Sequence, residues 1–284
     1  MRVLFTLLLL AASIVHPGDT RAQTPVVPDF WDPQERFIKP NLADRRRLRF
    51  LTVTDFPPFS YVDGRKRLSG FHVDLARMVC EELSLLAVCQ IQGMPPGELD
   101  EALARNAGDA IMAGLAPTAR SRSAQLHSRT YFRLPARLAV RRDGPLVRLR
   151  GRDTMAALEG RTLGVVDATS HAAFARAHMR ASVRVRLFAS QDAAFGALRD
   201  GAVDAVFSDA LTLARRLQSE TGAACCTLAG EPFLAPPYFG RPMTVAVRGD
   251  EVELIEGINY ALRAIAADGR FTELYLRYFP VSLF

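Results

Sequence analysis

Apolar residues recur along the chain with two alternating periods, and this alternation predicts the secondary structure. After residue 48, apolar runs of strand length are followed by stretches with apolar residues every three or four positions, as in a helix packed on a sheet. The predicted strands lie at 49–55, 87–92, 109–114, 162–166, 183–188, 204–208 and 244–247. The predicted helices lie at 71–84, 97–106, 170–180, 191–199, 209–218 and 252–267. Such alternation indicates β-α-β units and therefore an α/β fold with mainly parallel sheets flanked by helices.

Two segments far apart in the chain share one pattern. Residues 102–114 (ALARNAGDAIMAG) and 197–209 (ALRDGAVDAVFSD) both end a helix with Ala-Leu, and Asp-Ala opens an apolar strand six residues after that Leu. Two lobes of similar construction would produce this echo, and chance similarity is the alternative for so short a motif. The echo supports two α/β lobes without proving a duplication.

The first residues of the chain carry the pattern of an export signal. Arg2 gives a short basic start, 3–15 are almost wholly apolar, and small residues precede a cleavage point before Gln23. The apolar run is shorter than the ~20 residues that span a bilayer, which argues against a membrane anchor. The residue directly after the cleavage point is Gln23 and not a cysteine, so no lipid anchor is expected. The sequence therefore predicts a signal peptide at 1–22 and a soluble protein in the periplasm.

The segment 23–47 is rich in proline and charge, lacks hydrophobic periodicity and carries the single tryptophan, Trp31. We interpret it as an N-terminal extended arm, which is either pinned by Trp31 and Phe37 or disordered. The basic run at 45–49 leads directly into a strand, and the formal net charge of +6 is spread along the chain. We therefore predict a solvated entrance to the first domain and no nucleic-acid partner.

The four cysteines fit an oxidising compartment. Cys80 lies near the end of a predicted helix and Cys89 in the following strand, so a short loop closure could join them in a disulfide. Cys225 and Cys226 are adjacent, a vicinal disulfide would be strained, and we interpret them as two thiols on a strand. No CxxC or HExxH spacing occurs and the histidines do not cluster, so we expect neither a metal nor another cofactor.

Polar residues gather where the predicted strands end, which is where parallel α/β sheets bind ligands. The candidate ligand-binding residues are Asp55, Phe56, Gly114, Ala116, Thr118, Arg120, Arg122, Val166, Thr169, Ser170 and Asp209. An arginine and the start of a helix suit a carboxylate, and an aspartate at a facing strand end suits an ammonium. This set therefore fits a zwitterion, with Phe56 as a platform for its side chain.

Each of these residues also has a purely structural interpretation. Thr118, Ser170 and Asp209 are good helix caps, and Arg120 and Arg122 are surface charges in this alternative. The common location of the whole set at strand ends favours the ligand site.

At these same residues the chain resembles the family 3 extracellular solute-binding proteins, the periplasmic receptors of polar amino-acid ABC transporters. Six segments carry the resemblance in the same order: 54–61, 68–83, 108–118, 158–166, 198–209 and 268–280. The resemblance implies a two-lobed, periplasmic-binding-protein-like fold of type II. It implies a discontinuous first lobe of residues 48–134 plus 242–284 and a second lobe of residues 135–241, with a hinge of two crossing segments.

The resemblance also implies roles for the candidate residues. Phe56 would line the side-chain pocket, and the arginine after the small-residue turn would hold the ligand carboxylate. Thr169 and Ser170 would support that carboxylate from the second lobe, while Asp209 would bind the α-amino group.

The turn at 116–122 departs from the family's usual S-x-T-x-x-R pattern. Ungapped alignment places Ser121 at the arginine position with an arginine on each side. We favour Arg122 over Arg120, because a turn one residue longer would deliver it. Ala116 removes a hydroxyl that often contacts the ligand, so the departures leave the identity of the ligand open.

Together these features predict a monomeric periplasmic solute-binding protein that captures a small amino-acid-like ligand or related organic acid. Its other partner would be a membrane ABC transporter permease, and we expect no enzymatic activity. One alternative is a cyclohexadienyl-dehydratase-like enzyme, for which Asp55, Asp167 and Glu231 are the nearby acid–base candidates. Another is a periplasmic accessory protein that binds a protein partner and has a modified ligand site.

Overall fold

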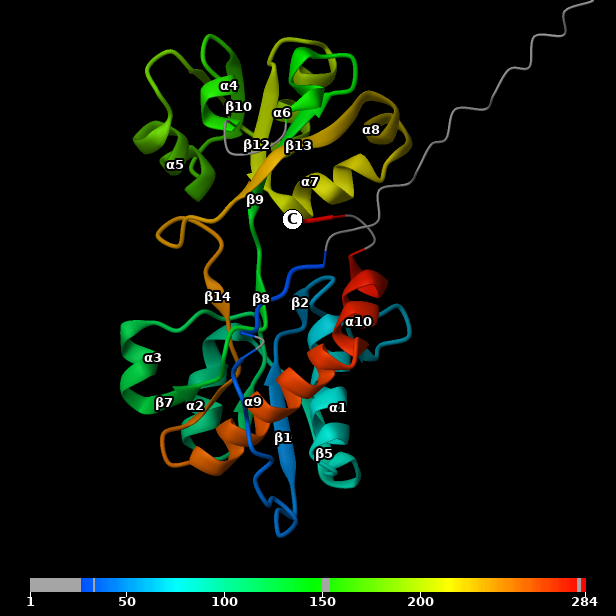
Figure 1. The fold of residues 1–284 in the computed structure, drawn as a ribbon, viewed down its shortest axis with the longest axis vertical. Coiled ribbons are helices and arrows are strands. Elements are labelled where there is room, and N and C mark those ends of the chain that lie inside the picture. Colours follow the sequence, from blue (N-terminus) through cyan, green and yellow to red (C-terminus); the bar gives the residue numbers. More distant parts are fainter. Residues whose placement is uncertain (1–26, 33, 150–153, 280–281) are drawn as a thin grey trace, which may run out of the picture.

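The computed structural model describes residues 27–32, 34–149, 154–279 and 282–284, which form two lobes joined by two crossing segments (Figure 1). The predicted signal peptide at 1–22 lies outside the described residues, as do the first four residues of the arm. No helix in the described part is both long and apolar enough to cross a bilayer.

The first lobe is built on a five-stranded sheet with the order β5-β1-β6-β15-β7. Its strands are β1 Leu48–Thr52, β5 Cys89–Gly93, β6 Ala110–Ile111, β7 Gln125–His127 and β15 Ala246–Arg248. Its helices are α1 Phe71–Glu82, α2 Leu99–Ala104, α3 Ala119–Ala124, α9 Val252–Ala267 and α10 Arg270–Tyr278, with short 3₁₀ turns η1 Leu86–Val88 and η2 Pro96–Glu98. A small antiparallel sheet of β2 Asp55–Phe56, β3 Ser60–Val62 and β4 Leu68–Ser69 follows β1.

The second lobe repeats this plan with the sheet order β11-β10-β12-β9-β13. Its strands are β9 Ala136–Arg141, β10 Thr162–Val166, β11 Arg184–Phe188, β12 Ala205–Asp209 and β13 Cys226–Phe233. Its helices are α4 Thr154–Ala157, α5 Ser170–His178, α6 Gln191–Arg199, α7 Ala210–Leu217 and α8 Glu220–Cys225, with the 3₁₀ turn η3 Pro145–Arg148.

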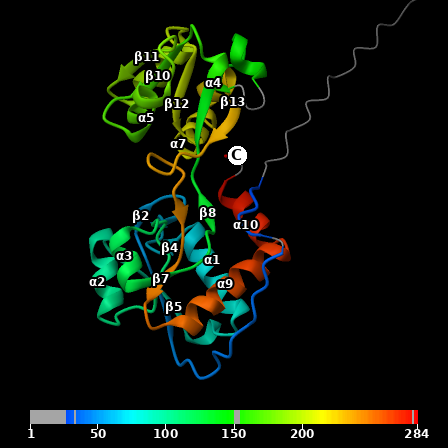
Figure 2. The same ribbon diagram turned by 60° about the vertical axis from the view of Figure 1, so that its left-hand side comes forward.

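The crossing segments run side by side between the lobes, where β8 Phe132–Arg133 pairs antiparallel with β14 Pro242–Met243 (Figures 1 and 2). They make both sheets mixed, because β9 and β15 enter their lobes antiparallel to β12 and β6. The two-lobed α/β class is confirmed. The parallel pairs, however, fill only one half of each sheet, a difference from the expected mainly parallel arrangement.

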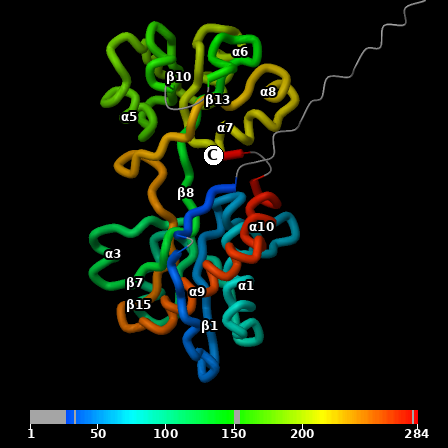
Figure 3. Tube along the Cα trace, viewed as in Figure 1, coloured from blue at the N-terminus to red at the C-terminus, as the bar shows by residue number. Residues whose placement is uncertain are grey.

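The arm runs the length of the first lobe without helix or strand in its described residues (Figure 3). Trp31 is buried in the core of this lobe, with its ring centroid 4.7 Å from that of Phe271. Leu42 is also buried, while Phe37 is half-buried. Burial of the large indole ring is what attaches the arm to α10.

Both cysteine pairs are disulfides. The Cys80–Cys89 bond, with Cα atoms 6.2 Å apart, confirms the prediction for that pair. Cys225 and Cys226 are joined as well, so the predicted pair of thiols on one strand is wrong. The two cysteines do not share a strand, because Cys225 ends α8 and Cys226 begins β13.

Candidate functional site

In the first lobe, Phe56 and Gly114 lie in contact at the ends of neighbouring strands. The Phe56 ring stacks on Phe59 with centroids 4.8 Å apart. Gly114 has φ of 72°, and a Cβ there would lie only 2.9 Å from Cε1 of Phe56. A side chain at position 114 would therefore displace the ring, and glycine lets the turn pass close to it.

A buried polar pair that the sequence did not reveal supports this turn from beneath. His72 and Tyr131 are both fully buried, with Nε2 and the hydroxyl oxygen 3.0 Å apart, and the Gly114 backbone also hydrogen-bonds this hydroxyl. Burial lowers the pKa of His72 to about 3, so its imidazole is neutral. The only sequence signal was a histidine on the apolar face of a predicted helix.

The turn after Gly114 leads into α3 through a capping box. The Thr118 side chain accepts a hydrogen bond from the Ser121 backbone N–H at 3.0 Å, and the Ser121 hydroxyl accepts one from the Thr118 N–H at 3.0 Å. Thr118 and Ser121 thus serve the helix start. Ala116 is half-buried and Arg120 is exposed on the first turn of α3.

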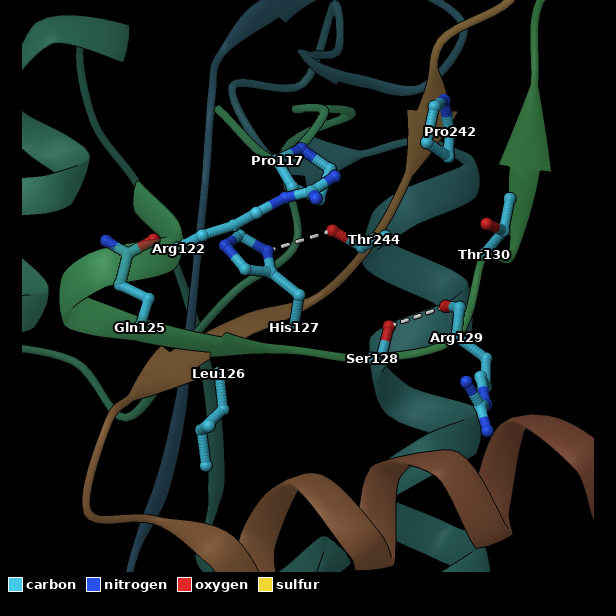
Figure 4. Close-up of a pocket in the computed structure, with 10 residues that line it drawn as sticks. All are labelled: Pro117, Arg122, Gln125, Leu126, His127, Ser128, Arg129, Thr130, Pro242 and Thr244. Atoms are coloured by element: carbon cyan, nitrogen blue, oxygen red, sulfur yellow. Dashed lines mark hydrogen bonds between the residues drawn. The ribbon is translucent and has the colours of Figure 1, made fainter. Parts of the chain in front are cut away.

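Arg122 is exposed on α3, beside a surface pocket. It lines a pocket of about 370 Å³ beside the crossing segments, together with His127 and Thr244 (Figure 4). Neither Phe56 nor Asp209 lines this pocket. Arg122 therefore does not share this pocket with Phe56 or Asp209.

In the second lobe, Thr169 caps α5 and fixes the turn after β10. Its hydroxyl donates to the Val166 carbonyl oxygen at 2.7 Å and accepts from the Ala172 N–H at 3.1 Å. The cap leaves Ser170 as the first residue of the helix, where backbone N–H groups have no intrahelical partner. An anion is favoured at such a helix start.

Asp209 ends β12 and caps α7. One carboxylate oxygen accepts a hydrogen bond from the Thr212 N–H at 2.8 Å, and the hydroxyl of Ser208 lies 3.5 Å from the other oxygen. The side chain is half-buried. The capping interpretation thus applies to one oxygen of Asp209, while the second oxygen has capacity for a cationic partner.

An aromatic wall that the sequence did not reveal surrounds the two helix starts. The His171 ring stacks on Phe239 with centroids 5.2 Å apart and meets Phe207 edge-on at 5.5 Å. Burial lowers the pKa of His171, and the charge of Asp209 opposes that shift, which places the imidazole within the field of the carboxylate. The adjacent aromatic residues at 238–239 were the signal in the sequence.

The lobes touch at one flank of these residues. Arg215 of α7 hydrogen-bonds the carbonyl oxygen of Pro57, the residue after Phe56. Arg241 donates to the Pro117 carbonyl oxygen at 3.2 Å. Asp55 is exposed where β2 begins, so it is free to face a ligand.

Residues 48–281 match the family model of the bacterial extracellular solute-binding proteins, family 3. ABC transporter arginine-binding protein 1 of Escherichia coli is 28% identical over 235 residues, covering 82% of this chain and 91% of that protein. The L-arginine-binding protein of Pseudomonas aeruginosa is 26% identical over 246 residues, covering 86% and 92%. The histidine-binding periplasmic protein of Salmonella typhimurium is 23% identical over 240 residues, covering 84% and 90%.

Solved structures share the fold at low sequence identity. The open form of the second substrate-binding domain of Lactococcus lactis GlnP has a TM-score of 0.69 and 17% identity, covering 84% of this chain and 97% of that one. The unliganded, open L-cystine receptor of Neisseria gonorrhoeae has a TM-score of 0.70 and 16% identity, covering 84% and 94%. With a family match over most of its length and this shared fold, the chain belongs to the bacterial extracellular solute-binding proteins, family 3.

Proposed function

We propose that this protein captures an amino acid as a zwitterion between its lobes and delivers it to an ABC transporter permease. The observation that carries the proposal is Asp209, whose half-buried carboxylate keeps one oxygen outside the α7 cap. In this proposal that oxygen binds the α-amino group. The protein acts as a periplasmic monomer exported by residues 1–22, and as a binding protein rather than an enzyme, in keeping with its relatives' names.

The carboxylate of the ligand needs binding groups of its own. We assign it to the start of α5 at Thr169 and Ser170 and to Arg120, which is exposed on α3 and outside the pocket that holds Arg122. A guanidinium can bind a carboxylate through two parallel hydrogen bonds. Arg120 therefore replaces the sequence-based preference for Arg122 in this proposal.

The side chain of the ligand would lie against Phe56, with Asp55 at the edge of the same lobe. An exposed carboxylate beside an aromatic platform favours a cationic side chain. Relatives named for arginine and histidine support the same class of ligand. We therefore propose a cationic amino acid, for which arginine is the first compound to test.

A ligand that contacts both lobes binds the closed arrangement more tightly than the open one, and this difference in affinity drives closure. The crossing segments at β8 and β14 would act as the hinge between residues 48–134 plus 242–284 and residues 135–241. The permease would then recognise the closed form.

The test is Asp209→Asn, measured by titration calorimetry with arginine. Asparagine is as good a helix cap as aspartate, so the melting temperature should not change, while the negative charge is lost. Removing one partner of a desolvated charge pair costs about 3–5 kcal/mol, so affinity should fall at least ~100-fold.

Asp167→Asn is the matched control, because Asp167 also follows a strand of this lobe but is exposed and paired with Arg176 at 2.8 Å. It should bind arginine as the wild type does. If the Asp209→Asn protein binds arginine with unchanged affinity, the proposed site is wrong.

A further inference from the structure

The pocket of Arg122 lies where both crossing segments leave the first lobe. One wall comes from the end of α3 and from β7, a second from residues 128–130 of the first crossing segment, and a third from Pro242 and Thr244 of the second (Figure 4). Pro117 also lines the pocket, which is open to solvent and has a volume of about 370 Å³. The space is large enough for a small ligand, and it is separate from the proposed amino-acid site.

The charges around this pocket are unbalanced. No aspartate or glutamate lines it, whereas two arginines do. Arg129 is neutralised by its ion pair with Glu35 of the arm. Arg122 forms no ion pair within the described part of the chain, and its guanidinium lies beside Pro117 (Figure 4). The pocket thus offers one uncompensated guanidinium.

A fixed polar network holds the floor of the pocket. The two ring nitrogens of His127 lie 3.1 Å from the Ser121 hydroxyl and 3.1 Å from the Thr244 hydroxyl. Thr244 is buried, so this network locks the second crossing segment to β7. The hydroxyl of Thr130 lies across the pocket from Arg122, on the first crossing segment (Figure 4).

We propose that this pocket binds a small oxyanion, a phosphate or a carboxylate, held by the Arg122 guanidinium and by the hydroxyl of Thr130. Charge-assisted hydrogen bonds from arginine suit both oxyanions. A bound oxyanion would tie α3 to the first crossing segment, beside the network that holds the second. The pocket is therefore an anion site next to the proposed hinge, and its existence does not depend on which amino acid the lobes capture.

The pKa of His127 should report on anion binding in this pocket. Burial lowers the pKa of His127, the positive charge of Arg122 lowers it further, and the negative charge of Asp100 opposes both. Asp100 is held by Gln125 at 2.9 Å, and Arg129 is paired with Glu35, so Arg122 is the group whose charge an anion would offset. Binding should therefore raise the pKa of His127, and anion affinity should increase as the pH falls through that value.

The experiment follows the His127 imidazole resonance by NMR while inorganic phosphate, and in a second arm succinate, is added at constant ionic strength in chloride. We expect a saturable shift and a raised pKa in at least one arm, and the tighter arm identifies the class of anion. Arg122→Gln should weaken this binding at least tenfold.

Arg120→Gln is the matched variant, since it removes the neighbouring arginine of the same helix. It should leave the anion response unchanged but weaken arginine binding, whereas Arg122→Gln should do the reverse. The inference is overturned if neither anion moves the His127 resonance, or if Arg122→Gln responds to the anion as the wild type does. It is also overturned if Arg122→Gln abolishes arginine binding without changing the anion response. Failure of Arg120→Gln to affect arginine binding would count against the proposed amino-acid site only.

Discussion

In the first lobe β1 pairs in parallel with β5 over five residue pairs and with β6 over two; in the second lobe β10 pairs with β11 over five and with β12 over two. The sequence echo lies at the same place in both lobes. Asp109 and Asp204, the aspartates of the two Asp-Ala pairs, each accept a hydrogen bond at 2.8 Å from a backbone N–H of the first strand, at Arg49 and Thr162 respectively. The echo thus marks a hydrogen bond that joins the start of one strand to its neighbour in both lobes.

The helix ends that precede these aspartates also correspond. Asn106 and Gly201 occupy matching positions and have φ of 60° and 76°. The lobes also differ at the last position of the echo, where the first has Gly114 and the second has Asp209. One scaffold therefore presents a close-packed backbone turn from one lobe and a carboxylate from the other, and function is determined at the strand ends.

The largest difference between the lobes is expected when the shared aspartates, Asp109 and Asp204, are replaced. The two replacements should lower the free energy of unfolding by different amounts, because the surroundings of the two side chains differ. The Asp109 side chain is 4% exposed and paired with Arg49 at 3.1 Å, whereas the Asp204 side chain is 26% exposed and lies 3.7 Å from Arg161. Asp109→Ala leaves a largely buried guanidinium without its partner, so the free energy of unfolding should fall by about 3–5 kcal/mol. Asp204→Ala should cost about 1 kcal/mol. Urea denaturation measures both, and equal losses would contradict the comparison.

The ion pair between Asp109 and Arg49 also predicts that the protein loses stability at low pH. Burial alone would raise the pKa of Asp109, but hydrogen bonds and charge from Arg49 outweigh it, so the net pKa lies below its ordinary value of 3.8. A carboxylate with a lowered folded pKa stabilises the fold above its unfolded pKa, and this contribution is lost as the pH falls through the folded value. Wild-type stability should drop below about pH 3.8, and the drop should be smaller in Asp109→Ala.

The divergent position can be tested from the first lobe with Gly114→Ala. A left-handed backbone costs a non-glycine residue about 1–2 kcal/mol, and the new Cβ would press on Phe56 and His72, so both stability and arginine affinity should fall. Gly160→Ala is the control, because Gly160 has φ of 71° with no atom within 4 Å of an added Cβ. The Gly160→Ala variant should lose stability but bind arginine as tightly as the wild type. Equal affinity in the two variants would show that Phe56 does not contact the ligand.

The smallest effect is expected from exchanging Asn106 and Gly201, the left-handed residues that follow the two helices. Glycine and asparagine both tolerate the left-handed conformation after a helix. Asn106→Gly and Gly201→Asn should each change the free energy of unfolding by less than about 1 kcal/mol. A larger loss in thermal unfolding would mean that the Asn106 side chain does more for the first lobe than its position in the echo implies.

The sequence predicted the bounds of some helices accurately but gave no bounds for two strands of the second lobe. The ranges of α6 and α9 are those of the predicted helices, since their apolar periodicity reflects burial against one sheet face. No range was predicted for the strands β9 and β13, although Cys226, the first residue of β13, was expected on a strand. β13 has a register shift between Ala229 and Phe233, so the regular alternation that marks a strand is interrupted.

The candidate site was predictable only in part. Asp209, Thr169 and Gly114 lie at strand ends as expected, because strand ends follow from the local pattern. The chemistry around them came from contacts between distant segments, such as His72 with Tyr131 and His171 with Phe239. No local pattern encodes such pairs.

What the sequence indicated by itself was the order of strands and helices, the repeated Asp-Ala pattern and the possible Cys80–Cys89 bond, each of which depends on neighbours close along the chain. Only the tertiary structure decided the direction of the crossing strands and the place of Arg122. A long side chain on the first turns of a short helix can reach several surroundings. Which one it meets depends on how the crossing segments pack against α3, and they come from positions far away in the sequence.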